Sequence, residues 1–218
     1  MTKNFSFGTI ENFDHHIEVS VPNYKHIHDL ILSISSYFIT DNSVVNDLGC
    51  STGLMIDTLD KFHKNKSVTY NGIERERNII NSSYFHDNRH ILVDDLSSMA
   101  LPTNSLSLSI FTLQFTPVDK RRDLIRKIYD SIKVGGAFII TEKIYQGFGD
   151  MQEIFTFSYY DLKSKEFTSD EILQKQKDLR KIQFPVSKEA NEQMLKDAGF
   201  SISTFYQSLN FIGWLCIK

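Results

Sequence analysis

An acid and two glycines follow directly after an apolar run, in the stretch Val44-Val45-Asn46-Asp47-Leu48-Gly49-Cys50-Ser51-Thr52-Gly53. Glycine lets the backbone approach a ligand closely and takes positive φ at no steric cost, so the pattern predicts a tight turn from a buried strand into a helix that starts near Ser51 or Thr52. The unpaired N–H groups of such a helix favour a carboxylate or another electron-rich group. The stretch therefore indicates a site for a nucleotide-like ligand, although the same residues also suit a plain turn.

Two further acids follow later apolar runs. Glu74, which precedes Arg75, offers a carboxylate that can accept hydrogen bonds from both hydroxyls of a ribose. Asp95 can accept from an adenine amino group while Leu96 packs against the ring. Each acid alone also suits a helix N-cap or a solvated turn. Because the glycine spacing departs from the Gly-x-Gly-x-x-Gly fingerprint of dinucleotide sites, a mononucleoside cofactor such as S-adenosylmethionine is favoured over NAD.

Short apolar runs alternate with amphipathic segments from residue 44 onward, which is typical of a Rossmann-like α/β domain with a mostly parallel sheet. The expected strands are 44–48, 68–74, 90–93, 106–111, 137–142, 201–207 and 211–218, with Val134-Gly135-Gly136 as the turn before the fifth. The expected helices are 24–38, 53–63, 77–85 and 119–132. Only three residues join the last two strands, which suits an antiparallel hairpin. We expect one domain over 1–218, with a helical N-terminal extension over 1–43 and an inserted lid over 144–199.

Composition narrows the functional classes. The chain has 218 residues, 41% of them hydrophobic, and a net charge of −3, so one full core is expected and no global field favours nucleic acid or a membrane. Two distant cysteines fit neither a disulfide framework nor a metal site, and the N-terminus lacks an apolar leader, so a cytoplasmic protein without membrane contact is expected. The adjacent His15 and His16 would point to different sides, and we predict no metal. The basic run over 120–127 is interpreted as a solvated helix face.

Several motifs carry a resemblance to known proteins. The order of the Asp-Leu-Gly-Cys-Ser turn, the later acids and the Gly135-Gly136 turn resembles the class I S-adenosylmethionine-dependent methyltransferases, whose seventh strand is antiparallel. Over nearly the whole chain the sequence is similar to the carboxy-S-adenosyl-L-methionine synthases, which serve wobble-uridine modification in bacterial tRNA. The most specific matching motifs are Ser20-Val21-Pro22-Asn23-Tyr24, Phe111-Thr112-Leu113-Gln114-Phe115 and Gln174-Lys175.

The resemblance implies a function and a site. Members of that family use prephenate to convert the methyl group of S-adenosylmethionine into a carboxymethyl group through a sulfonium ylid; the resemblance also implies a homodimer, with the tRNA handled by a separate enzyme. The cofactor, or its carboxylated form, would then contact Tyr24, Gly49, Cys50, Ser51, Glu74, Arg75, Asp95 and Leu96. We add Asp47, Gly53, Phe111 and Gln176 to this expected cofactor set.

Two positions depart from the family pattern. Gln176 stands where the family has an arginine that holds the carboxylate of the modified cofactor, and Ile110 stands where it has an asparagine. A neutral amide cannot replace the charge of a guanidinium, and losing such a bond costs about 1.5–3 kcal/mol. Lys175, Lys177 and Arg180 lie close enough in sequence to substitute for the arginine.

Three functions therefore stay open at this point: a carboxy-S-adenosyl-L-methionine synthase with a rearranged carboxylate site, a methyltransferase for another small acceptor, and a non-catalytic cofactor-binding protein. The candidate catalytic residues are Tyr24, Tyr159, Tyr160 and Gln176. The tyrosines of the aromatic run over 155–160 suit the core of a lid better than an acid-base role.

Overall fold

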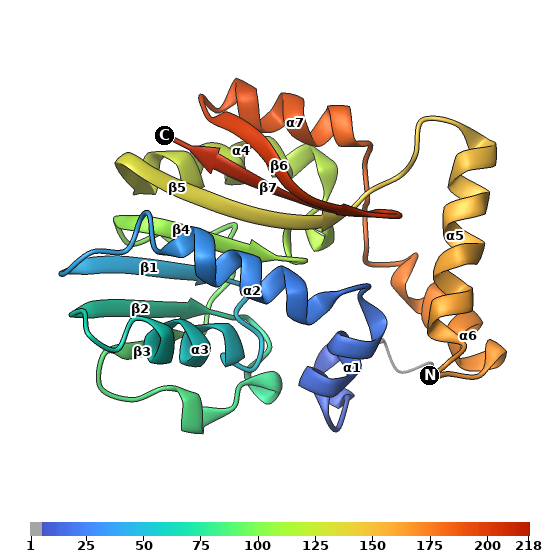
Figure 1. The fold of residues 1–218 in the computed structure, drawn as a ribbon, viewed down its shortest axis with the longest axis horizontal. Coiled ribbons are helices and arrows are strands. Elements are labelled where there is room, and N and C mark those ends of the chain that lie inside the picture. Colours follow the sequence, from blue (N-terminus) through green and yellow to red (C-terminus); the bar gives the residue numbers. More distant parts are fainter. Residues whose placement is uncertain (1–5) are drawn as a thin grey trace.

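A single seven-stranded sheet forms the centre of the molecule in the computed structural model, which describes residues 6–218 (Figure 1). Its strand order is β3-β2-β1-β4-β5-β7-β6. The strands are β1 (Ser43–Leu48), β2 (Val68–Ile73), β3 (Arg89–Leu92), β4 (Asn104–Ile110), β5 (Ile132–Lys143), β6 (Ser201–Ser208) and β7 (Phe211–Ile217). The prediction that the chain starts without an apolar leader falls mainly on residues 1–5, outside the described residues.

Strand direction confirms the predicted fold. Strands β1 to β5 pair in parallel, whereas β7 pairs antiparallel with both β5 and β6, so β7 alone is reversed. The carboxyl ends of the five parallel strands therefore lie at one edge of the sheet, toward α1 (Phe13–Ser20), α5 (Gly149–Lys163) and α6 (Ser169–Leu179) (Figure 1). That edge is where open α/β sheets bind ligands.

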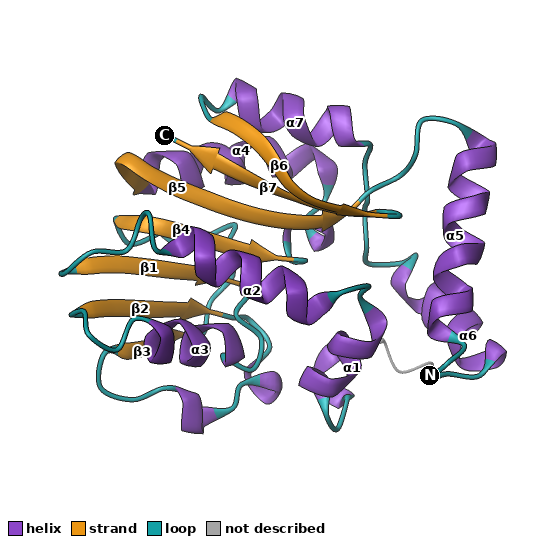
Figure 2. Ribbon diagram, viewed as in Figure 1, coloured by secondary structure: helices purple, strands orange, loops and turns teal. Residues whose placement is uncertain are grey.

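Helices cover both faces of the sheet (Figure 2). On one face, α2 (Tyr24–Ser35) and α3 (Leu54–Phe62) bury Ile27, Ile31 and Leu59 in one apolar core. On the other, α4 (Val118–Ser131) and α7 (Lys188–Asp197) contribute to a second core that contains Trp214. In α4 the apolar residues recur at helical spacing, so one side of an otherwise charged helix is buried; these residues are Leu124, Ile125 and Ile128.

The expected helix over 77–85 is wrong. The segment forms two short 3-10 turns, Arg77–Ile79 and Ser82–Tyr84, separated by extended backbone. Phe85 explains the break, because its ring packs where a side chain at Gly53 would lie; a Cβ there would be 2.5 Å from Phe85 Cε2. Placing this ring against the turn after β1 fixes the chain in a path that a continuous helix could not follow.

Two element boundaries also differ from expectation. Helix α3 begins at Leu54 instead of near Ser51 or Thr52, because Ser51 and Gly53 take left-handed backbone conformations (φ 55° and 96°). Strand β5 begins at Ile132, so it includes Gly135 and Gly136, which were expected to form a turn before the strand. Its pairing register with β4 shifts between Asn104 and Leu106.

The predicted lid over 144–199 is longer than the inserted part. Only α5 and α6 stand beyond the strand ends, whereas α7 packs on α4 and β6 as part of the main fold (Figure 1). Trp214 of β7 donates a hydrogen bond from Nε1 to Glu192 Oε1 of α7 (3.1 Å), which ties this helix to the sheet. The segment that can serve as a substrate element therefore ends before residue 188.

Candidate active site

A cavity of about 430 Å³ lies at the carboxyl ends of the parallel strands, between the sheet, α1 and the inserted helices. Its size is within the range of small-molecule sites. Residues that follow β1, β2, β3 and β4 line it, together with residues of α1, α2, α5 and α6. Of the residues predicted from sequence, it brings together Tyr24, Asp47, Gly49, Cys50, Ser51, Glu74, Arg75, Asp95, Leu96, Phe111 and Tyr159.

The turn after β1 forms part of the cavity wall. Gly49 has a φ of 78°, and a Cβ there would lie 2.3 Å from Thr112 Cγ2, so no other residue fits without displacing the loop after β4. The next turn residue, Ser51, has a buried Oγ that has no hydrogen-bond partner among residues 6–218. A buried hydroxyl without a partner is costly, and a polar ligand group in the cavity would satisfy it.

Glu74 is held in place by two backbone donors. The Ser51 N–H donates to Oε2 (3.0 Å), and the Glu76 N–H donates to Oε1 (2.9 Å). Since a carboxylate can accept about four hydrogen bonds, two acceptor positions remain for a ligand. The arrangement presents a fixed acceptor pair of the kind that binds the two hydroxyls of a ribose.

Asp95 lies in a similar acceptor turn after β3. Its Oδ1 accepts from the backbone N–H (2.8 Å) and the hydroxyl (2.6 Å) of Ser97. These bonds favour the charged form and lower the pKa of Asp95. The carboxylate is therefore ionised at neutral pH and available as an acceptor beside Leu96.

Asp47 is the most buried acid of the cavity wall, with 2% of its surface exposed. Burial and the neighbouring Glu74 carboxylate raise its pKa to about 7. Both causes disfavour the charged form, so at neutral pH this carboxyl group is close to half protonated.

His28 is a cavity residue that sequence reasoning missed. It lies one helical turn after Tyr24, and the two rings pack against each other at a tilt of 48° with centroids 4.3 Å apart. Burial lowers the pKa of His28 to about 4, so it is neutral at pH 7, and its Nε2 has no hydrogen-bond partner in the described part of the chain. The i, i+4 spacing from Tyr24 was the signal that could have identified it.

The N-terminal extension closes one side of the cavity. Asp14 and His16 of α1 line it, and Asp14 Oδ1 accepts a hydrogen bond from Thr52 Oγ1 (2.7 Å). Tyr159 of α5 also joins this side, because its hydroxyl donates to the Ser20 carbonyl (2.8 Å). With its proton engaged and its pKa raised by burial, Tyr159 serves better as a contact than as a base.

Three predicted site residues lie outside the cavity lining: Gly53, Tyr160 and Gln176. Gly53 backs onto Phe85, and Tyr160 packs against Phe157 at a centroid distance of 6.1 Å. Gln176 is half-buried in α6, while its neighbour Lys175 faces the cavity. Ile110 also lines the cavity.

Within residues 6–218, no cluster of three or more His, Cys, Asp or Glu side chains is placed to hold a metal ion. None of the described helices is long and apolar enough to cross a membrane.

The strand order, the reversed β7 and the cavity at the strand ends define a class I methyltransferase fold. Human N-acetylserotonin methyltransferase, solved in complex with SAM, matches with a TM-score of 0.61 at 16% identity over 94% of this chain and 55% of that one, so this chain spans about half its length. Magnesium protoporphyrin IX methyltransferase from Synechocystis, solved with bound SAM, matches with a TM-score of 0.59 at 11% identity, covering 96% and 92% of the two chains. At these identities the likeness concerns the fold.

Sequence relatives define the family more narrowly. The carboxy-S-adenosyl-L-methionine synthase of Staphylococcus epidermidis is 32% identical over 215 residues, covering 96% of this chain and 94% of the relative. The enzyme of the same name from Desulfotalea psychrophila is 26% identical, covering 98% and 91%. No family model matches the chain. The chain belongs to the carboxy-S-adenosyl-L-methionine synthase family.

Proposed function

We propose that the protein is a carboxy-S-adenosyl-L-methionine synthase, which transfers a carboxyl group from prephenate to the methyl group of S-adenosylmethionine. Family membership over nearly the full length carries this proposal. The cavity supports it, because the Glu74 and Asp95 acceptors and the unpartnered Ser51 hydroxyl fit a nucleoside joined to an amino acid.

The residues of the cavity would divide the cofactor among them. Glu74 would accept from the ribose hydroxyls, Asp95 from the adenine amino group, and Leu96 would pack on the ring. The turn from Gly49 to Ser51 would bind the amino-acid end. When bound, the cofactor supplies a methyl group activated by its sulfonium.

The protein's own contribution would be alignment and exclusion of water. Phe111 and Tyr159 give the cavity an apolar wall next to its polar groups, and α1 covers one side. Holding donor and cofactor together in such a site lowers the entropic part of the barrier. The product would feed wobble-uridine modification of tRNA by a separate enzyme.

Mass analysis of the reaction separates the candidate functions. Purified protein incubated with S-adenosylmethionine and prephenate should yield the carboxylated cofactor. Formation of S-adenosylhomocysteine only after addition of cell extract would instead indicate a methyltransferase for another acceptor, which the relatives do not favour. Failure to bind the cofactor in calorimetry would contradict both enzymatic functions.

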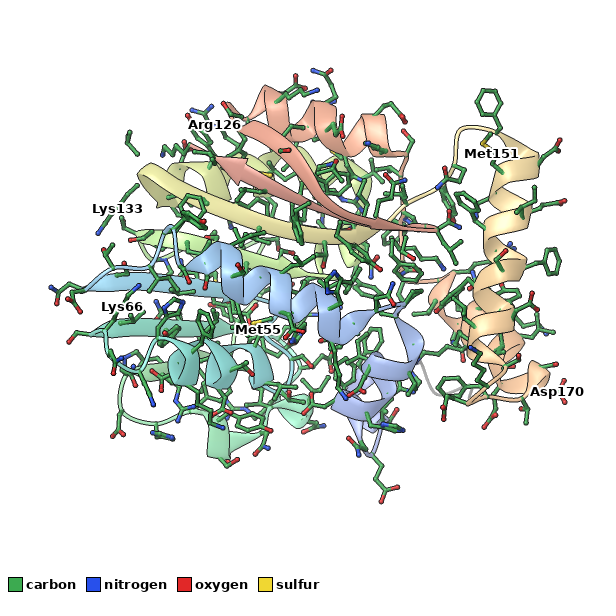
Figure 3. All side chains as sticks on the ribbon, viewed as in Figure 1. Met55, Lys66, Arg126, Lys133, Met151 and Asp170 are labelled. Carbon is green, nitrogen blue, oxygen red and sulfur yellow. The ribbon has the colours of Figure 1, made fainter. Side chains whose placement is uncertain are left out.

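We further propose a homodimer formed through α5. The outer side of this helix carries large apolar residues that are mostly exposed, namely Phe148 just before it (72%), Met151 (51%), Ile154 (59%) and Phe157 (63%). Figure 3 shows side chains projecting outward from α5 near the labelled Met151. An apolar stripe of this kind marks an interface. Phe157→Asp should shift the protein from dimer to monomer in analytical ultracentrifugation, and an unchanged mass would contradict this interface.

Nucleic-acid binding is not part of the proposal. Two basic residues of α4 are engaged within the protein: Arg122 pairs with Asp197, and Lys127 donates to the carbonyls of Leu96, Ser97 and Met99. Both cysteines, Cys50 and Cys216, are buried free thiols, which supports a reducing, cytoplasmic setting.

A further inference from the structure

Three lysines from three different elements converge on one side of the cavity. Lys143 ends β5, Lys163 ends α5, and Lys175 lies in the middle of α6; all three line the cavity. The ammonium groups of Lys143 and Lys163 lie 5.3 Å and 5.6 Å from the centroid of the same Tyr159 ring. The Lys163 ammonium also lies 4.9 Å from the Phe167 ring, and that of Lys175 lies 5.1 Å from the Phe7 ring. The lysines and these aromatic rings thus form one compact wall.

Two lysines of this wall, Lys143 and Lys163, carry positive charge that no carboxylate among residues 6–218 pairs with. Neither Lys143 nor Lys163 forms an ion pair with a carboxylate anywhere in residues 6–218, although the Lys163 side chain is only 6% exposed. His16, on the facing helix α1, adds no negative charge. Asp178 of α6 is an acid near Lys175, and its charge raises the pKa of Lys175. Contact with aromatic rings is a weak attraction compared with the cost of taking an ammonium group out of water.

The pKa values agree with this geometry. Burial lowers the pKa of Lys143 to about 8, with a contribution from Lys163, and burial and Lys163 also lower the pKa of Lys175 to about 8. A cluster of like charges that resists protonation would be stabilised by an anion placed among its members. An anion with two carboxylates could contact more than one lysine at once.

Position 176 does not supply such a contact in this chain. Successive residues of a helix point about 100° apart, so Lys175 faces the cavity and Gln176 does not line it. Lys175 was one of three cations that the sequence offered as a substitute for the missing arginine. The other two, Lys177 and Arg180, do not line the cavity.

We propose that Lys143, Lys163 and Lys175 together bind the carboxylates of the carboxyl donor, a small dicarboxylic acid, so that three lysines supply the charge absent from position 176. This inference rests on the proposed function, because it assigns the donor side of the same cavity. The cofactor side, at Glu74 and Asp95, takes no part in it.

The test compares charge removal inside and outside this wall. Lys163→Met and Lys143→Met remove the charge but keep most of the side-chain volume. Lys165→Met removes an exposed lysine of the same segment and serves as the matched control. We expect the KM for prephenate to rise roughly ten- to a hundred-fold in the first two variants and to stay within about threefold in the control. Lys163→Arg, which keeps the charge, should have a KM for prephenate close to that of the wild type. The calorimetric Kd for S-adenosylmethionine should change less than about threefold in every variant.

Binding measurements keep this inference separate from the proposed reaction. Prephenate is titrated into the wild type and into Lys163→Met, both saturated with S-adenosylhomocysteine. Prephenate binding that depends on Lys163, without any carboxylated product, would support the lysine site and contradict the proposed synthase activity. Product formation with an unchanged KM in both methionine variants, a parallel loss of cofactor affinity, or no prephenate binding by the wild type would overturn the lysine site.

Discussion

The two sides of the cavity are built differently. The acceptor side consists of carboxylates at the ends of three neighbouring strands: Asp47 near the end of β1, Glu74 directly after β2 and Asp95 shortly after β3. Backbone N–H groups hold Glu74 and Asp95 in position. The lysine side joins the end of β5 to α5 and α6, and aromatic rings surround its ammonium groups. The first side is a property of the sheet that any chain with this strand order can form. The second depends on the inserted helices, to which we assign the contacts with the carboxyl donor.

The largest effect is expected on the acceptor side. Glu74→Ala removes the proposed ribose acceptor and also leaves the Ser51 and Glu76 N–H groups without their partner. Hydrogen bonds to a charged group contribute about 1.5–3 kcal/mol each, so the Kd for S-adenosylmethionine should rise roughly a hundred-fold in calorimetry. Asp87→Asn, an exposed acid away from the cavity, serves as the control. Equal affinity of Glu74→Ala and wild type would remove the basis for the acceptor side.

Asp47 should make stability depend on pH. Its native pKa of about 7 lies above the unfolded value, so its contribution to stability is complete at low pH and is lost as the pH rises toward 7. Between pH 5 and pH 8 this amounts to about 2.7 kcal/mol, because roughly two pH units of the loss fall in this interval and each corresponds to about 1.4 kcal/mol. We therefore measure the free energy of unfolding in urea for Asp47→Asn and for wild type. The variant's value minus the wild-type value should be higher at pH 8 than at pH 5. The same difference between the two proteins at both pH values would contradict the raised pKa.

The lysine side should show its own pH dependence. Lys143 and Lys175 have pKa values of about 8 beside Lys163, His16, Tyr159 and Asp178, and only the protonated forms attract a carboxylate. The kcat/KM for prephenate should fall roughly tenfold or more from pH 7.5 to pH 9.5, since this ratio reports on the free enzyme. The Kd for S-adenosylmethionine, which the proposal assigns to the other side of the cavity, should change less than about threefold over this range. A kcat/KM for prephenate that is constant to pH 9.5 would argue against lysine binding.

The smallest effect is expected at the position where the family arginine is missing. Because Gln176 does not line the cavity, Gln176→Arg should change the KM for prephenate by less than about threefold. Lys175→Met gives the comparison, since the neighbouring side chain does line the cavity. An improvement of tenfold or more in Gln176→Arg would show that position 176 reaches the donor after all.

The same contrast explains which features the sequence could predict. The order Asp47, Glu74, Asp95 was readable because each acid follows a strand, and parallel strands bring their ends together at one edge of the sheet. The reversed β7 was readable from the short connection before it. Lys143 ends the parallel strand β5 and could have been identified in the same way. Lys163 carried no such signal, because its placement depends on how α5 packs beyond the sheet. The false helix over 77–85 has a similar cause, since the packing of Phe85 on Gly53 is a contact between distant residues that periodicity does not reveal.

A crystal structure with S-adenosylhomocysteine and prephenate bound together would test the division of the cavity most directly. The account predicts ribose hydroxyls on Glu74 and at least one prephenate carboxylate within about 4 Å of the Lys163 or Lys143 ammonium group. Donor carboxylates bound away from Lys143, Lys163 and Lys175, or a ribose that does not contact Glu74, would contradict it.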